Sequence, residues 1–516
     1  MEDISPALLI EEDISILTTN RIPSADDTNG IKSRNTERKE IIRESYERIA
    51  ALQALCHKLT VACEIGEAIV APIRCIPREI LEEIFVQCIP SLPTMSSRCI
   101  RNSHPHPQDV AELLESVCHR WRTIVHDTPR IWSTPVLDRA IREPEDVYKL
   151  LAKSKSCPLD ILIDPCQWFR HRHKQVEKCT DVLGMLRSQL WRIQSLVSDM
   201  HRHSGAVIFP NGFSINSPIM QTLSYTDVDT PYIDDDYPRF NCPKLRSVSL
   251  RDCEPIVRSL VANPVQTVRH LAVCFSRSQT LYLDLLRTLP NLVSLHWSGY
   301  RKLPEIPQAV VLKSLKSLRL DATESVTDVL SSLHVPSLES LELLVGVGYG
   351  QFVYDAICAL CGDGSVKLRR LHIVHGELPV RAIRSLLRQL DRLETLIIER
   401  SDEVEGLLIA LAPPDQDFSL VCPHLTTLVI AESDFYPEPL IEFVYRRMQA
   451  DSKETAPGFV KCLKLTETGE LFTALSRHNF LRTHRATIHL MLRMDYHFTP
   501  LVFSTTLPER RYGWDV

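Results

Sequence analysis

An apolar triplet with side chains at positions 0, +3 and +5 recurs between residues 245 and 430 of the 516-residue chain. Its eight copies begin at Leu245, Val268, Leu292, Leu315, Leu338, Leu368, Leu393 and Leu425. Successive copies are 23 to 32 residues apart. Because apolar residues make up 44% of the chain, a single triplet has little weight and the regular spacing is the evidence. A repeat of this length predicts stacked units, each burying its apolar side chains against its neighbours.

The L-x-x-L-x-L pattern and its period are similar to those of the leucine-rich-repeat family. This resemblance implies one short strand per repeat, aligned in a parallel sheet on the inner wall of an arc. Helical stretches between the triplets, such as 382–390 and 440–448, would form the outer wall. The family's Asn or Cys at +8 is present only as Cys253. We therefore expect an irregular α/β solenoid without a continuous Asn ladder at 136–475, followed by a C-terminal cap or tail at 476–516.

Side chains alternate between the two faces of a strand, so residues at +2 and +4 should point away from the buried triplets. In the central repeats several of these positions hold charged or imidazole side chains. The last two repeats hold more aliphatic groups there, so we predict that this concave face binds a protein partner with a polar centre and an apolar edge; the alternative is a merely solvated face. The candidate residues are His270, His296, Arg319, Glu342, Arg370 and His372.

The N-terminal region changes character near residue 36. Residues 1–35 are rich in acidic and small polar side chains and lack a sustained apolar period, which favours a disordered arm. Residues 36–70 are predicted to form an amphipathic helix. Its apolar stripe could pack against the same chain or associate with a second copy as a coiled coil, and the sequence leaves both open. The stripe consists of Ile42, Ile49, Leu52, Cys56, Leu59 and Cys63.

Two further amphipathic helices are predicted between residues 71 and 135. The first begins near Pro77, whose missing N–H is tolerated in the first turn of a helix. A polar insertion at about 89–109 follows and is predicted to be a loop. After it, one continuous helix is expected over 110–125. The apolar faces of the two helices contain Ile80, Leu81, Ile84 and Phe85, and then Leu114, Val117, Cys118, Trp121 and Val125.

In this order, IPREILEEIF, SVCHRWRTIV and the terminal Trp132 resemble the F-box family, including the stretched versions in the expanded families of mushroom-forming fungi. The family usually has a brief turn where this chain has the insertion. The resemblance implies a non-catalytic subunit of a ubiquitin ligase, which binds the Skp adaptor subunit, and through it a cullin, while the repeats bind an unknown protein substrate. The residues implied in Skp binding are Pro77, Ile80, Leu81, Ile84, Phe85, Val117, Cys118 and Trp121.

The combined expectation is an α+β chain: a helical F-box module at 71–135, then the leucine-rich-repeat solenoid. A different class of function also fits these patterns. The chain could be an interaction scaffold without any ligase role, in which the N-terminal helices cap the end of the solenoid. Binding of the Skp subunit would discriminate between the two.

Charge and motifs exclude several other classes of function. A net charge of −6 disfavours nucleic acid and anionic membranes as partners. The acidic start and the lack of a long apolar run predict neither a secretory leader nor a membrane span, so we expect a cytoplasmic or nuclear protein with reduced cysteines. Cys358 and Cys361 lie at the wrong spacing from His372 and His375 for a zinc finger. With no catalytic motif, we expect no enzyme activity, metal or cofactor.

Overall fold

The computed structural model is an α+β protein, with helices at the N-terminal side and one long, mainly parallel sheet after them. It divides into two compact units, Met1–Ile84 and Phe85–Val516. None of the described helices combines the length and the apolar character that crossing a bilayer requires. The residues described are 18, 22–90, 106–137, 144–163, 174–199, 214–226, 239–275, 279–299, 309–321, 326–345, 350–361, 366–374, 380–401, 404–412, 421–433, 435–436, 438–443, 446, 462–466, 488–494 and 497–503.

The first unit contains the long helix α2 (Ala25–Val70), the short α3 (Pro72–Cys75) and the start of α4 (Arg78–Cys88). The Ser24 hydroxyl accepts a bond from the Asp27 N–H at 3.1 Å, and the Asp27 carboxylate accepts one from the Ser24 N–H at 3.0 Å. This capping box starts the helix at Ala25. The predicted disordered arm at 1–35 is thus wrong from Ala25 onward, because capping supports helix in a polar segment; residues 1–17 and 19–21 lie outside the described residues.

The predicted helix over 110–125 is wrong in its continuity. It consists of α5 (Pro107–Val117) and α6 (His119–Asp127), separated by Cys118, whose backbone is extended with φ −162° and ψ 167°. The apolar period predicted one helix because a single extended residue leaves the same stripe on both sides of the break. Since α5 already begins at Pro107, the expected loop insertion at 89–109 is helical at its end, and residues 91–105 of it lie outside the described residues.

Fifteen strands of the second unit form one sheet, in the order β1-β2-β3-β5-β7-β8-β9-β11-β13-β14-β15-β16-β17-β18-β19. Every pair is parallel except the last, in which β18 and β19 run antiparallel. Two further sheets each contain one short parallel pair of strands, β4 with β6 and β10 with β12. The order means that successive strands add to the growing edge of the sheet, as in a solenoid.

The strands of the main sheet are β1 (Val136–Leu137), β2 (Leu159–Ile163), β3 (Ile193–Asp199), β5 (Thr222–Thr226), β7 (Ser247–Arg251), β8 (His270–Phe275), β9 (Ser294–Gly299), β11 (Ser317–Asp321), β13 (Ser340–Leu344), β14 (Arg370–Val374), β15 (Thr395–Glu399), β16 (Thr427–Ala431), β17 (Cys462–Thr466), β18 (Ile488–Met494) and β19 (His497–Phe503). The short pairs are β4 (Ser214–Asn216), β6 (Arg239–Asn241), β10 (Val310–Val311) and β12 (Leu333–His334). Within the predicted C-terminal cap or tail at 476–516, the described residues form β18 and β19, which continue the sheet.

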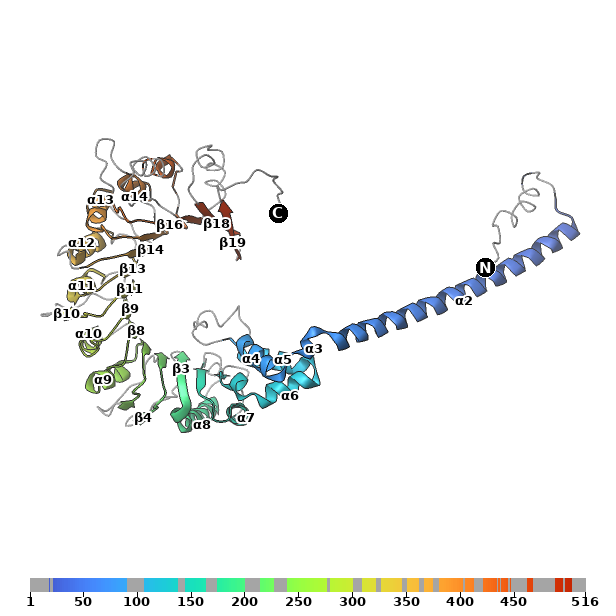
Figure 1. The fold of residues 1–516 in the computed structure, drawn as a ribbon, viewed down its shortest axis with the longest axis horizontal. Helices are drawn as coiled ribbons and strands as arrows, with labels where there is room; N and C mark the ends of the chain where they lie inside the picture. Colours follow the sequence, from blue (N-terminus) through green and yellow to red (C-terminus); the bar gives the residue numbers. More distant parts are fainter. Residues whose placement is uncertain are drawn as a thin grey trace. The chain divides into compact units, whose positions relative to one another are not determined.

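Helices cover one face of this sheet along the second unit, and the other face is left without them (Figure 1). The expected outer helix at 382–390 is α13, and of the expected helix at 440–448 the part within 438–443 is described and helical. The connecting helices are η3 (Pro129–Trp132), α7 (Pro144–Lys153), α8 (Lys174–Ser188), η5 (Leu190–Arg192), α9 (Glu254–Ala262), α10 (Gln279–Arg287), α11 (Val326–Ser332), α12 (Gly350–Cys361), α13 (Val380–Gln389) and α14 (Val404–Leu411).

The eight apolar triplets build the core between sheet and helices. Each strand from β7 to β16 in the main sheet begins at the +2 residue of its triplet, and all three triplet side chains are buried. The intervening +2 and +4 residues are more accessible, as period-two alternation requires. The predicted inward and outward sets of side chains are therefore confirmed.

The described +8 positions hold small polar side chains instead of Asn. The Cys253 thiol donates to the carbonyl of Tyr225 at 3.1 Å, and the Ser401 N–H donates to the Ser433 hydroxyl at 3.0 Å. All three +8 side chains are buried. Small hydroxyl and thiol groups thus satisfy the backbone where the chain leaves the strand. The other +8 positions lie outside the described residues.

Candidate functional site

Four of the candidate residues form a row across the face of the sheet that the helices leave uncovered. The parallel register places Arg319 on β11 beside His296 on β9 and beside Glu342 on β13. Glu342 in turn is the register partner of His372 on β14. Each occupies the +4 position of its triplet, so a constant register converts a sequence spacing into a row of neighbouring side chains.

One end of this polar row is centred on Asp321. The Asp321 carboxylate lies 2.7 Å from His296 Nε2 and 3.0 Å from Arg319 Nε, which donates to it. Arg319 Nη1 also lies 2.9 Å from the Glu342 carboxylate. A single guanidinium therefore joins two carboxylates on neighbouring strands and fixes their positions.

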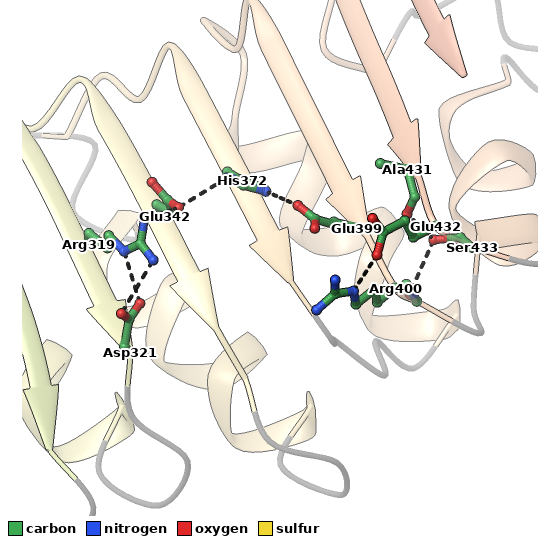
Figure 2. Close-up of polar contacts among 10 residues, drawn as sticks. Arg319, Asp321, Glu342, His372, Glu399, Arg400, Ala431, Glu432 and Ser433 are labelled. Carbon is green, nitrogen blue, oxygen red and sulfur yellow. Dashed lines mark hydrogen bonds and ion pairs between the residues drawn. The ribbon is translucent and has the colours of Figure 1, made fainter. Parts of the chain in front are cut away.

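The other end of the row is centred on His372 (Figure 2). Its Nδ1 lies 3.4 Å from Glu342, and its Nε2 lies 3.4 Å from the Glu399 carboxylate on β15. The Nε2 atom is buried and within ion-pair distance of Glu399, but the pair lacks the alignment of a hydrogen bond. Arg400, directly after β15, forms a further ion pair at 2.6 Å with Glu432, directly after β16. The imidazole thus joins three strands through two carboxylates.

The row carries more negative than positive fixed charge. Burial raises the pKa of Asp321, but the hydrogen bonds from His296 and Arg319 outweigh it, and the net pKa lies below its usual 3.8. The hydrogen bond with His372 is the main reason that the pKa of Glu342 lies below its usual 4.5. One guanidinium faces the carboxylates of Asp321, Glu342 and Glu399. Carboxylates therefore outnumber guanidinium groups in this part of the face.

Acid is expected to remove the stability that this row contributes. Because the folded pKa values of Asp321 and Glu342 are lowered, the contribution is present above pH 3.8 and 4.5 and is lost as the pH falls below them. Asp321→Asn is therefore expected to lower the thermal unfolding midpoint at about pH 7 and to differ much less from wild type at about pH 3. The exposed Asp391 provides the control, since Asp391→Asn should change the thermal unfolding midpoint only slightly at both pH values. If Asp321→Asn lowered the midpoint by the same amount at both pH values, the coupling would be contradicted.

The remaining two face candidates, His270 and Arg370, lie outside the row. Both are exposed +2 residues at the starts of β8 and β14, and neither takes part in an ion pair among the described residues. Sequence reasoning in turn missed Asp321 and Glu399, which hold the two imidazoles. Both stand at +6, where the alternation of +2 and +4 continues for one more step, so extending the same pattern would have found them.

The segment at 71–135 divides its candidates between surface and core. On α4, Leu81 and Phe85 are buried, whereas Ile80 and Ile84 are 54% and 43% exposed. Pro77, just before α4, is exposed. Leu81 and Phe85 therefore offer no surface to a partner as the chain stands. Ile80 and Ile84 are one helical turn apart and present one apolar pair.

A second apolar pair lies on α5. Val117 is 55% exposed, and Leu113, which sequence reasoning missed, is 66% exposed one turn earlier. Cys118 and Trp121 are half-buried. The Trp121 ring packs against Phe85, with ring centroids 4.7 Å apart. Trp121 thus serves mainly the module's own core, and the exposed pair on this helix is Leu113 with Val117.

Trp132 completes the core of the segment. Its indole N–H donates to the Val125 carbonyl at 3.0 Å, and the Lys153 ammonium lies 3.5 Å from the ring centroid. Such a contact between a cation and an aromatic face orients the ring. Trp132 therefore holds α6 to the following chain and is not a surface residue.

No known protein-family model matches the chain, and no curated protein matches it. Among the described residues, no three His, Cys, Asp or Glu side chains are placed to hold one metal ion. The Cys358 and Cys361 thiols lie in α12, where Cys358 is half-buried and Cys361 is buried.

Proposed function

We propose that the chain is the substrate-recognition adaptor of a Skp/cullin/F-box ubiquitin ligase. In this proposal the F-box-like segment at 71–135 binds the Skp subunit, and the uncovered face of the leucine-rich-repeat sheet binds a protein substrate. The observation that carries it is the exposure of Ile80 with Ile84 on α4 and of Leu113 with Val117 on α5. An aliphatic pair left in water on each of two helices supports a protein-binding role.

The repeat part of the proposal is supported by the burial pattern of the triplets. Leu318 and Leu320, for example, are fully buried, while Arg319 between them reaches the polar row. One strand per 23 to 32 residues, each adding in parallel to the last, is the arrangement that a leucine-rich repeat requires. The parallel strands therefore support the proposal that the sheet is a leucine-rich-repeat solenoid.

The work of such an adaptor is to hold two proteins together. A substrate held near a charged conjugating enzyme experiences a high effective concentration, so transfer of ubiquitin becomes nearly intramolecular. The polar row would select the substrate: its excess of carboxylates favours a segment with basic and polar side chains, and rejects an acidic one.

Replacing Ile80 and Ile84 together by Asp is expected to weaken Skp binding at least about 100-fold, because two charges would enter an apolar interface. The measurement is capture of the purified Skp subunit by the full-length chain, quantified by titration. Since both side chains are exposed, the circular dichroism spectrum should be that of wild type. The control is Ala54→Asp with Val61→Asp, which adds the same charges to exposed positions of α2 and should leave Skp binding intact.

Unchanged Skp binding by the Ile80/Ile84 variant would remove that pair from the interface. If the wild-type chain binds no Skp subunit, the proposal fails and the alternative gains, namely a repeat scaffold whose N-terminal helices serve as a cap. The contact of Phe85 with Trp121 favours this alternative, because part of the motif's apolar surface is already covered.

A further inference from the structure

Helix α2 exposes apolar side chains along most of its second half. Among its 46 residues, Ile42, Ile49, Leu52, Leu59 and others are exposed. From residue 49 to the end of the helix the only Lys, Arg, Asp and Glu residues are Lys58, Glu64 and Glu67. A solvated helix normally carries polar groups on every face that lacks a partner. This segment is instead suited to being covered.

Some of the exposed apolar residues, among them Ile42, Ile49 and Val70, recur at multiples of seven positions, and others such as Leu55 and Ile65 lie beside this stripe. Reading the helix as heptads puts β-branched residues or cysteines at the a positions and leucine at the two central d positions. A seven-residue repeat, unlike the 3.6-residue period of a helix packed on a globular core, follows a partner helix for its whole length. The a residues are Ile42, Ile49, Cys56, Cys63 and Val70, and the d residues are Ser45, Leu52, Leu59 and Gly66.

The only described helix long enough to match this stripe is α2 itself. The stripe covers four heptads, roughly 42 Å of helix at 1.5 Å per residue. The next longest described helix, α8, has 15 residues. A helix of matching length and matching pattern is supplied by a second copy of the chain. We propose that the chain forms a homodimer through a parallel, in-register coiled coil of α2 over Ile42–Val70.

The side chains at the seam favour two strands and this orientation. The heptad of Ile49 and Leu52 has Ile at a with Leu at d, the combination that favours two-stranded parallel coiled coils. In register, Cys56 faces the partner's Cys56 and Cys63 faces the partner's Cys63. The flanking positions bring no like charges together, since Arg48 lies opposite the partner's Gln53 and Glu67 opposite the partner's Ala62. Ser45 and Gly66 weaken the two ends, so Ile49–Cys63 forms the main contact.

The test is the molar mass of the full-length chain by sedimentation or light scattering. Wild type should have twice the mass of one chain, and Leu52→Asp with Leu59→Asp should have the mass of one chain. Ala54→Asp with Val61→Asp places the same two charges, also one heptad apart, at the f positions and should stay dimeric. A monomeric or trimeric wild type would overturn the proposal, as would a monomeric f-position variant or a dimeric d-position variant.

Orientation is tested with a short bismaleimide cross-linker that joins two thiols. Wild type should give a covalent dimer, and Cys56→Ser with Cys63→Ser should lose most of it while keeping the dimer mass. Equal cross-linking of both proteins would contradict the parallel register. Dimer formation does not depend on the ligase proposal, because the d-position variant should still bind the Skp subunit and the Ile80/Ile84 variant should still be dimeric.

Discussion

Replacing Arg192 with methionine is expected to destabilise the first repeats by about 3 kcal/mol or more. Arg192 is 3% exposed and lies in η5, just before β3. Its guanidinium donates to the Leu151 carbonyl at 3.1 Å, the Cys157 carbonyl at 3.3 Å and the Lys155 carbonyl. Methionine fills a similar volume but leaves these buried acceptors without donors, and each such loss costs about 1–3 kcal/mol.

The position of the charge adds to the effect. Leu151 and Lys155 lie at and just beyond the C-terminal end of α7, where helix carbonyls lack partners and the dipole is negative. Arg192 also donates to the Ser154 hydroxyl at 3.0 Å, and Ser154 is itself fully buried. Burial lowers the pKa of the guanidinium, which stays charged because its usual value is far above neutral. One side chain thus ties the end of α7 to the start of β3.

Thermal and urea unfolding of the full-length chain would measure this loss. The matched control is Trp191→Ala, a change at the neighbouring residue, whose side chain is 54% exposed. That control should shift the free energy of unfolding by less than about 1 kcal/mol. Arg192→Lys should recover only part of the stability, because one ammonium cannot reach all the carbonyls that the planar fork reaches. A wild-type unfolding midpoint for Arg192→Met would contradict the argument.

The sequence predicted those parts of the fold that follow from a constant period. The apolar triplets located the strands, because a buried strand needs the same spacing in every repeat, and alternation then gave the row of His296, Arg319, Glu342 and His372. Asp321 and Glu399 were not predicted as members of the row, because they lie beyond the last residue of the triplet. Arg192 escaped for another reason. Its partners are backbone carbonyl groups, which every residue has, so no pattern of side chains in the sequence predicts these hydrogen bonds.

Local breaks in regular structure were equally hidden. The extended residue Cys118 interrupts a stripe that reads as one helix, and the Ser24 capping box begins α2 inside a segment with the composition of a disordered arm. Both features depend on one or two backbone groups. The exposed pair of Leu113 and Val117 was also out of reach, because periodicity defines an apolar face without saying whether anything covers it.

Replacing Trp297 with alanine is expected to cost about 3–5 kcal/mol, because it removes the largest of the fully buried side chains among the described residues. Trp297 takes the +5 position of its triplet on β9. The Phe275 ring meets it edge-on, with centroids 4.8 Å apart. Phe275 also lies so close to Gly299 that a Cβ there would be 2.6 Å from the ring, which leaves the cluster little room to rearrange. The vacated volume should therefore remain largely empty.

Phenylalanine is the informative comparison. The Trp297 indole nitrogen is buried without a hydrogen bond among the described residues, so Trp297→Phe leaves no partner unsatisfied. It should cost clearly less than Trp297→Ala. If the two variants were equally unstable, the indole N–H would have a partner and the argument from volume would fail.

The alanine variant should also change how the sheet unfolds. Each repeat contacts mainly its neighbours, so a weak point at β9 separates the strands before it from those after it. Urea unfolding of Trp297→Ala is expected to become broader, or to split into two transitions, while Trp297→Phe keeps the wild-type shape. Because His296 is the adjacent residue on the opposite face, the same lesion should loosen the contact of His296 with Asp321. The stacked core on one face thereby holds the polar row on the other face in register, and a single sharp transition for the alanine variant would contradict this coupling.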